Sequence, residues 1–337
     1  VQIPSMHRVA VVGAGVVGLS SALAIKEAHP SINVTIISDR PFEETCSYGP
    51  AGLFRIDNPK YRDLGRASFV RFAELNKRFP GSETGIKLLS GTIMSNDRAL
   101  LETQEEAYGD TVLNFRWLTD AERTMLFPKP ADHAIFFTTF ASEGVRYVPF
   151  LRRQLEELEG VTFENRRLEA LDELADSFDV VVNCSGIDGG KLAGDDDTVF
   201  PVRGIAIQIE APWHKHFYYQ NLDTFTIPMN GAVTLGSVKQ TNRTDTTITD
   251  EDRRDIWERY LEIHPQMEGA KVLREWIALR PGRKEVRLEA QQRQTAAGEQ
   301  YTVIHNYGHG GNGFTLGWGC AQEVLQLLEK ELGLSKL

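Results

Sequence analysis

A glycine-rich turn close to the N-terminus, Gly-Ala-Gly-Val-Val-Gly at residues 13–18, constrains the fold more than any other part of the sequence. A β-type segment at residues 8–12 comes before it, and helix-forming residues 19–28 follow it up to Pro30. A second β-rich segment occupies residues 33–38. This order of strand, turn, helix and strand predicts a right-handed βαβ unit in a parallel sheet.

The three glycines of this turn are expected to have different tasks. Gly13 makes the tight turn, Gly15 lets the backbone approach a pyrophosphate, and Gly18 lets the helix pack closely on the strand. The N-terminus of the helix offers free N–H groups and the positive end of its dipole to phosphates. Asp39 follows Gly18 by 21 positions, where a carboxylate can accept hydrogen bonds from ribose hydroxyls. The motif predicts a dinucleotide site, and by itself it fits NAD as well as FAD.

A second glycine cluster, Tyr-Gly-His-Gly-Gly-Asn-Gly-Phe-Thr at residues 307–315, precedes a predicted helix at residues 313–332. Glycine at this density lets the backbone approach a flat ligand. A helix N-terminus at the same place stabilises negative charge on a reduced ring system. A flavin needs this at its N1–C2=O2 edge and a nicotinamide does not, so the two clusters together favour FAD.

The remaining pattern predicts two discontinuous domains. Helices are expected at residues 61–78, 99–108, 147–158 and 251–263, and strands at residues 179–184, 202–210, 224–228, 232–236 and 271–279. The predicted fold class is α/β. A Rossmann-like FAD-binding domain comprises residues 1–55, 140–195 and 278–337, and a more β-rich α+β substrate-binding domain comprises residues 56–139 and 196–277.

Charge and composition limit the partners of the chain. The net charge of −10 over 337 residues argues against nucleic acid and anionic membranes, and no apolar run approaches the length of a membrane helix. Three cysteines without zinc-ligand spacing predict neither a metal site nor a disulfide framework. The terminal tripeptide Ser335-Lys336-Leu337 predicts recognition by the peroxisomal import receptor and location in the peroxisomal matrix. The oligomeric state is left open.

A Leu-Arg-Pro tripeptide at residues 279–281 ends a predicted strand and offers a candidate ligand for a carboxylate. The guanidinium of Arg280 can bind a carboxylate through two parallel hydrogen bonds. The neighbouring Arg283, Lys284 and Arg287 are expected on a solvated strand face.

The chain resembles the D-amino-acid oxidases, and more closely the D-aspartate oxidases, including those of nematode type. Matching stretches occur in family order at residues 11–20, 51–53, 182–186, 200–204, 211–213, 233–236, 279–281 and 305–310. The Leu-Arg-Pro tripeptide and the C-terminal glycine cluster carry the most specific part of the likeness. Residues 49–55 resemble the nematode members in particular.

The resemblance implies roles for individual residues. Arg280 corresponds to the arginine that binds the substrate α-carboxylate, and Lys239 and Arg55 correspond to basic groups for a side-chain carboxylate. The implied substrate residues are Arg280, Lys239, Arg55, Phe225, Tyr219 and Gly311. The implied FAD contacts are Gly13, Gly15, Val16, Val17, Gly18, Asp39, Arg40, Thr45, Cys46, Ser47, Gly52, Leu53, Leu168, Ser185, Gly186, Gly310, Asn312, Gly313, Phe314 and Thr315.

One position departs from the family pattern. The usual tyrosine beside the substrate carboxylate is Phe225 in this chain, so its hydroxyl is absent. Tyr218 and Tyr219, on the neighbouring segment, are both candidates to replace it. The loop at residues 218–224 is also short compared with the mammalian lid, as in the nematode members.

The implied activity is FAD-dependent oxidative deamination of acidic D-amino acids such as D-Asp, D-Glu or N-methyl-D-Asp. A hydride passes from Cα to flavin N5, O2 becomes hydrogen peroxide, and the imine hydrolyses to a 2-oxo acid and ammonia. Lys239 and Arg55 are expected to be buried or half-buried charges that need the substrate as their partner. Two alternatives stay open: an oxidase for neutral D-amino acids, glycine or sarcosine, and an NAD-dependent dehydrogenase or non-enzymatic flavin-binding protein.

Overall fold

The computed structural model describes residues 7–241 and 243–334, and the chain forms two compact units. The first unit comprises Val1–Tyr48, Val148–Pro201 and Arg280–Leu337, and the second comprises Gly49–Tyr147 and Val202–Leu279. These ranges differ from the expected domains at each internal boundary. Gly52, Leu53 and Arg55 therefore lie in the second unit, although they were expected in the FAD-binding domain.

The first unit contains a six-stranded sheet of the predicted Rossmann-like kind. Its strand order is β13-β14-β7-β1-β2-β6, with parallel pairing throughout except between β13 and β14. The strands are β1 (Arg8–Val12), β2 (Asn33–Ser38), β6 (Val161–Asn165), β7 (Val180–Asn183), β13 (Arg287–Gln294) and β14 (Gln300–Tyr307). The central strands β1, β7 and β14 are largely buried, which suits a sheet covered on both faces, and the predicted α/β class is confirmed.

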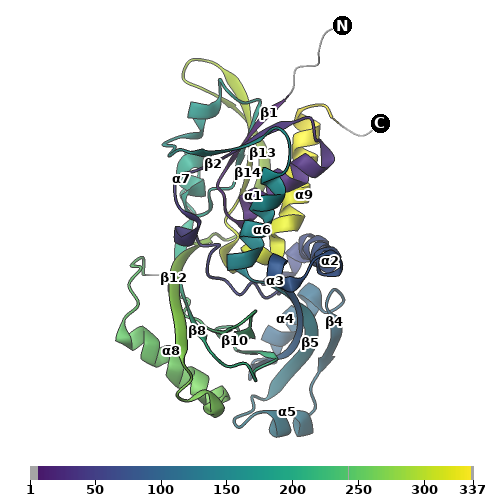
Figure 1. Ribbon diagram of the computed structural model, residues 1–337, viewed down its shortest axis with the longest axis vertical. Coiled ribbons are helices and arrows are strands. Elements are labelled where there is room, and N and C mark those ends of the chain that lie inside the picture. Colours follow the sequence, from purple (N-terminus) through teal and green to yellow (C-terminus); the bar gives the residue numbers. More distant parts are fainter. Residues whose placement is uncertain (1–6, 242, 335–337) are drawn as a thin grey trace. The chain divides into compact units, whose positions relative to one another are not determined.

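Two long helices of the first unit lie side by side against this sheet (Figure 1). Helix α1 (Val16–Ala28) follows the glycine turn, and helix α9 (Gly313–Glu331), yellow in Figure 1, follows the second glycine cluster. Nearly all of α1 is buried, as expected for a helix that is apolar on every side. The shorter elements are η1 (Phe42–Glu44), η3 (Leu171–Leu174), η4 (Gly186–Asp188), α7 (Gly189–Ala193) and η6 (Gly310–Asn312).

The second unit is built on an eight-stranded mixed sheet with the order β12-β8-β11-β10-β9-β3-β5-β4. Its strands are β3 (Ile86–Ser95), β4 (Leu113–Trp117), β5 (His133–Ser142), β8 (Phe200–Ile209), β9 (Phe217–Gln220), β10 (Thr224–Pro228), β11 (Val233–Gly236) and β12 (Val272–Gly282). Strands β3 and β5 pair antiparallel over ten residues each, whereas β3 and β9 pair parallel. Strand β8 begins before Val202, where this unit resumes, and strand β12 ends after Leu279, the last residue of the unit.

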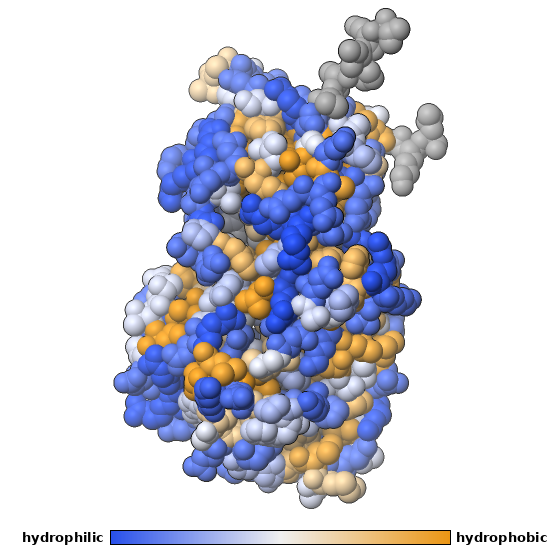
Figure 2. Space-filling model, viewed as in Figure 1, coloured by the Kyte–Doolittle hydropathy of each residue, from blue (hydrophilic) through white to orange (hydrophobic). Residues whose placement is uncertain are grey.

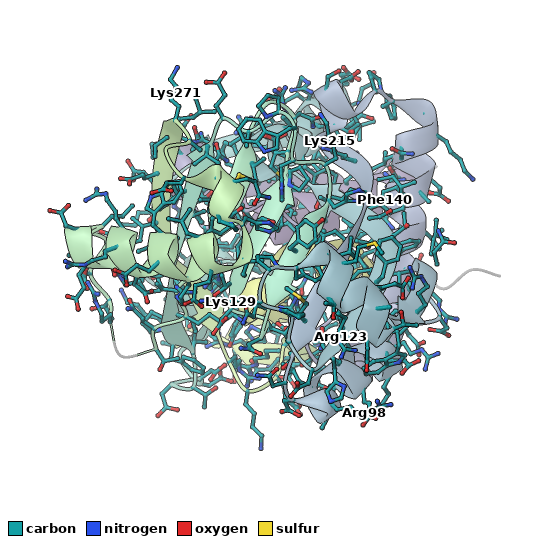
Figure 3. All side chains as sticks on the ribbon, turned by 90° about the horizontal axis from the view of Figure 1, so that it is seen from below. Arg98, Arg123, Lys129, Phe140, Lys215 and Lys271 are labelled. Carbon is teal, nitrogen blue, oxygen red and sulfur yellow. The ribbon has the colours of Figure 1, made fainter. Side chains whose placement is uncertain are left out.

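The second unit contains helices with and without side-chain caps at their N-termini. They are α2 (Arg62–Arg78), α3 (Gly81–Thr84), α4 (Arg98–Tyr108), α5 (Asp120–Leu126) and α8 (Asp250–Ile263), with η2 (Pro59–Tyr61) and η5 (Pro265–Met267), while α6 (Gly144–Glu156) spans the unit boundary. Asp97 caps α4, and Thr119 and Thr249 form capping boxes at α5 and α8. In Figure 3, the labelled Lys271 extends away from the ribbon, whereas Phe140 is only 4% exposed.

The visible face of each unit carries polar and apolar residues intermixed (Figure 2). Across residues 7–241 and 243–334, no helix is both long enough and apolar enough to cross a bilayer. The same residues contain no group of three or more His, Cys, Asp or Glu side chains placed to hold a metal ion.

Candidate active site

The helices α1 and α9 of the first unit begin without side-chain caps, in contrast to α4, α5 and α8. The N-cap residues Gly15 and Asn312 make no side-chain cap hydrogen bond, and neither first turn contains an acidic residue. The first N–H groups of a helix have no intrahelical acceptor, and the dipole adds positive potential there. Both helix ends can therefore bind anionic groups of a ligand.

The turn before α1 has no space for side chains at its glycines. Gly13 has φ +111°, and a Cβ at this position would lie 2.4 Å from the Cys184 carbonyl oxygen. At Gly18 a Cβ would lie 1.9 Å from the Gly13 carbonyl oxygen, and at Gly15 it would lie 2.9 Å from Ser47 Oγ. The predicted tasks of close turn and close helix packing are confirmed for Gly13 and Gly18 by these distances.

Asp39 follows β2 and stays ionised at neutral pH. Its Oδ1 accepts a hydrogen bond from Arg40 Nε at 2.8 Å, and Arg167 lies 3.3 Å from its Oδ2. The hydrogen bond from Arg40 holds the pKa of Asp39 below its usual value. Arg40 also donates to Asp188 Oδ2 at 2.8 Å. A carboxylate with further acceptor capacity at the end of β2 fits a ribose diol.

The loop that follows β2 returns to the start of α1. The Val16 N–H donates to Ser47 Oγ at 3.0 Å, and Thr45 Oγ1 donates to the Phe42 carbonyl. Burial raises the pKa of the Cys46 thiol, although the charge of Arg280 acts in the opposite direction. The Cys46 side chain is therefore a neutral thiol rather than a nucleophilic thiolate.

Three further expected FAD residues lie near β7 or in the core beside it. Ser185 Oγ donates to Asn183 Oδ1 at 2.6 Å, which orients the hydroxyl at the end of β7. Gly186 has φ +62°, and a Cβ there would meet no atom within 4 Å among the described residues. The side chain of Leu168, in contrast, packs in the hydrophobic core with Val12 and Val181.

The C-terminal glycine cluster brings a buried imidazole to the start of α9. Gly308 and Gly310 have φ values of +86° and +55°, which favour glycine. His309 is 7% exposed, and its Nε2 has no hydrogen-bond partner among the residues that the structure describes. Burial lowers the pKa of His309 to about 4, so the ring is neutral. Asn312, Phe314 and Thr315 are buried, whereas Gly311 is exposed.

These features of the first unit fit a bound FAD. Two uncapped helix ends, a turn without space for Cβ atoms, a ribose-type carboxylate and an orphaned buried nitrogen suit a long, flat, anionic ligand.

Arg280 is half-buried at the end of β12, as expected for a residue that binds a small anion. Arg283 and Arg287 do not form the solvated face that the sequence predicted, since they pair with Asp196 and Asp195.

Arg55 is the most buried of the basic residues predicted to bind substrate. It is 8% exposed, its Nη1 donates to Asp57 Oδ1 at 2.5 Å and to Gln104 Oε1 at 3.3 Å, and its guanidinium lies 5.7 Å from the Tyr219 ring centroid. Burial acts to lower the pKa of Arg55, but Asp57, Tyr219 and Tyr108 together raise it above its usual value. Arg55 is charged, and the expectation that it lacks protein partners is wrong.

The pairing of β9 and β10 separates the two candidate tyrosines. Tyr219 lies directly opposite Phe225, and Tyr218 lies opposite Thr226. Cross-strand partners share a face of the sheet, and the Tyr219 and Phe225 rings are stacked with centroids 5.0 Å apart. Tyr218 points to the other face, where its ring contacts Phe127. Only Tyr219 of the two therefore shares the face that carries Phe225 and Arg55.

Lys239 lies just after β11 and is exposed. The expectation that its charge is buried or half-buried is therefore wrong, and the cost of burying a charge argues only for Arg55.

Gly52, with φ +62°, and Leu53 lie in the second unit near Ser142 and Ala141.

Sequence reasoning missed the partners that orient Arg55. Asp57 is two positions further along the chain, in a loop. The Arg-x-Asp spacing only weakly indicated the hydrogen bond between the two side chains. Gln104 comes from α4, 49 residues further along the chain, and it also accepts a hydrogen bond from the Tyr108 hydroxyl. Nothing in the local sequence indicates that contact.

The fold and the ligand-binding features of the first unit define a Rossmann-type flavoprotein. Residues 8–327 match the family model described as FAD dependent oxidoreductase, and the chain belongs to this family. Its cofactor is FAD, which confirms the interpretation of the two glycine clusters.

Curated relatives match nearly the whole chain. D-aspartate oxidase 2 of Caenorhabditis briggsae is 54% identical over 331 residues, covering 98% of this chain and all of the relative. D-aspartate oxidase 1 of Caenorhabditis elegans is 52% identical, with 98% and 99% covered, and human D-aspartate oxidase is 36% identical, with 96% and 95% covered. The predicted resemblance to D-aspartate oxidases, nematode members included, is confirmed.

Solved structures share the fold at low sequence identity. The glycine oxidase of Bacillus cereus superimposes with a TM-score of 0.77 at 19% identity, covering 98% of this chain and 96% of its own. An iminodiacetate oxidase from a Chelativorans species gives a TM-score of 0.74 at 17% identity, with 96% and 95% covered. At this level of sequence identity, the similarities show a shared fold alone.

The close packing at Gly18 predicts a defect in FAD binding. In Gly18→Ala the added methyl group pushes α1 away from the turn, at a cost of about 1–3 kcal/mol in stability. The variant is expected to lose flavin absorbance during gel filtration. Gly317→Ala in α9 is the matched control, because its Cβ would lie 3.8 Å from the nearest atom outside its own helix, Ser20 Oγ. Equal flavin retention in both variants would contradict the role of Gly18.

Proposed function

We propose that this protein is an FAD-dependent oxidase that deaminates acidic D-amino acids. The observation that carries the acidic preference is Arg55, a buried and charged guanidinium on the face shared with Tyr219. The names of the curated relatives support the same substrate class. An amino acid, O2 and water would give a 2-oxo acid, ammonia and hydrogen peroxide.

We further propose a role for each substrate residue. Arg280 binds the α-carboxylate through its guanidinium and so orients Cα. Arg55 and Lys239 bind the side-chain carboxylate. The bound FAD would supply the two-electron chemistry. No side-chain base is assigned, because the amino acid reacts with its amine already neutral.

The two units are proposed to divide these tasks. The features for FAD, together with Arg280, belong to the first unit. Arg55, Tyr219, Phe225 and Lys239 belong to the second, which we assign as the substrate-binding domain. Gly52 and Leu53 would extend the FAD contacts to that unit.

An oxidase for neutral D-amino acids is the alternative on the same fold. Such an enzyme would still need Arg280 for the α-carboxylate. Its substrates have no side-chain carboxylate that could bind Arg55 beside the Tyr219 and Phe225 rings. Arg55 is partly neutralised by Asp57, so the attraction for an acidic side chain depends on Lys239 as well. The two basic residues are therefore expected to act together.

A substrate panel on the purified holoenzyme tests the acidic preference. We expect D-Asp to be oxidised with a higher kcat/KM than D-Ala in a peroxide assay. Removing a charge-assisted hydrogen bond in Arg55→Ala or Lys239→Ala should lower kcat/KM for D-Asp by about tenfold or more, with little change for D-Ala. Arg98→Ala, an exposed arginine paired with Glu102 in the same unit, is the control. Unchanged D-Asp turnover in both variants would overturn the assignment.

Tyr219 is proposed to donate the hydrogen bond that Phe225 cannot make to the α-carboxylate. Because acidic and neutral amino acids share that carboxylate, Tyr219→Phe should raise KM for D-Asp and D-Ala alike, by about tenfold. Tyr218→Phe on the opposite face is the matched control and should leave both values unchanged. An effect confined to Tyr218→Phe would refute this choice of tyrosine.

We propose import into the peroxisomal matrix through Ser335-Lys336-Leu337, which lie outside the described residues. A fluorescent protein fused to the N-terminus of the chain should colocalise with a peroxisomal marker. The same fusion without the tripeptide should be diffuse. Peroxisomal signal from the truncated fusion would show that the tripeptide is not the address.

A further inference from the structure

Two arginines anchor the backbone on both sides of Lys239. We refer to residues 237–241 and 243–247 as the Lys239 segment. It follows β11 and leads to the N-cap of α8. Arg203 comes from β8 and Arg259 from α8, the green helix at the left of Figure 3. Neither residue was indicated by the sequence as part of a site.

Arg203 binds the segment downstream of Lys239. Its side chain is fully buried, and its guanidinium donates to Gln240 Oε1 at 2.7 Å, to the Asp245 carbonyl at 3.0 Å and to the Thr247 carbonyl at 2.6 Å. The backbones of Arg203 and Gln240 also exchange two hydrogen bonds, of 3.0 and 3.2 Å. The residue next to Lys239 is thus tied to Arg203 by three hydrogen bonds.

Asp252 links this arrangement to the start of α8. It is 4% exposed and accepts from Arg203 Nη1 and Nη2 at 3.1 and 2.8 Å. Hydrogen bonding from Arg203 holds the pKa of Asp252 well below its usual range, so the carboxylate of Asp252 is ionised at neutral pH. Asp252 also accepts from the N–H and hydroxyl of Thr249 and from Arg243 Nη1.

Arg259 binds the segment upstream of Lys239. Its Nη2 donates to the Ser237 carbonyl at 3.0 Å, and its Nη1 donates to Thr224 Oγ1. Asp255, one turn earlier on α8, accepts from Arg259 Nε and Nη2 and orients the guanidinium. The Ser237 N–H donates to the Asp223 carbonyl at 2.9 Å, so this end is tied to the residue before β10 as well as to α8.

A lysine loses considerable rotamer entropy when it binds a ligand, and a mobile backbone would add to that cost. Because the residues on either side of Lys239 are anchored, the backbone is already ordered before the substrate binds. The backbone contribution to the entropy cost of binding is therefore removed. We propose that Arg203 and Arg259 are positioning residues that set the preference for acidic over neutral D-amino acids by fixing the backbone around Lys239. This inference rests on the proposed function of Lys239.

The test measures the ratio of kcat/KM for D-Asp to kcat/KM for D-Ala in the holoenzyme. Arg259→Lys keeps the charge but cannot reach Ser237, Thr224 and Asp255 together, and it should lower the ratio by about tenfold through KM for D-Asp. Arg253→Lys is the matched control, since Arg253 lies on the same helix and bonds to Glu275 and Asp250. It should leave the ratio unchanged.

A second variant probes Arg203 without disturbing its buried charge. Gln240→Met removes the side-chain bond between Arg203 and the segment, and the half-buried position tolerates the change. It should lower the ratio in the same direction as Arg259→Lys. Arg259→Lys and Gln240→Met are then each combined with Lys239→Ala. If these residues act through Lys239, neither substitution changes the ratio further in that background.

The outcomes separate the two proposals. If Lys239→Ala lowers the ratio but Arg259→Lys and Gln240→Met do not, the positioning role is overturned and the proposed function stands. The role also fails if both variants lower turnover of D-Asp and D-Ala equally, or add to Lys239→Ala. If Lys239→Ala itself leaves the ratio unchanged, the proposed role of Lys239 and this inference fall together.

Discussion

The contact between α1 and the turn before it leaves no room for even one methyl group, and the first unit is organised around that contact. A Cβ at Gly18 would lie 1.9 Å from the Gly13 carbonyl oxygen, so the helix begins as close to the sheet as backbone atoms permit. In Rossmann-type folds a turn of this kind places the first N–H groups of the helix close to the pyrophosphate of the dinucleotide.

The N-termini of α4, α5 and α8 in the second unit differ from those of α1 and α9 in the first. In the second, Asp97, Thr119 and Thr249 satisfy the N–H groups of α4, α5 and α8 with their own side chains. In the first, the described residues leave α1 and α9 without such caps. A side-chain cap would compete with an anionic ligand for the same N–H groups.

The elements that could be predicted from sequence are those determined by local interactions. The βαβ unit follows from the glycine turn, and the start of α8 follows from the Thr249 cap. Strands β3 and β5 were not predicted, because their stability depends on pairing with each other across some 40 residues of chain. The same limit applies to the candidate site. Arg280 and Arg55 were identified by the family resemblance, whereas Gln104 and Arg203 became evident only through contacts between distant residues.

The stacked pair of Tyr219 and Phe225 has a consequence for how such a sheet can change. Two aromatic rings that face each other across antiparallel strands lie about 5 Å apart and bury similar volumes. A hydroxyl group can therefore move from one ring to the other through two single substitutions that leave the backbone, the stacking and the packing on Gly236 almost unaltered. In the role proposed for Tyr219, the hydroxyl that is absent at position 225 is supplied by its partner on the neighbouring strand.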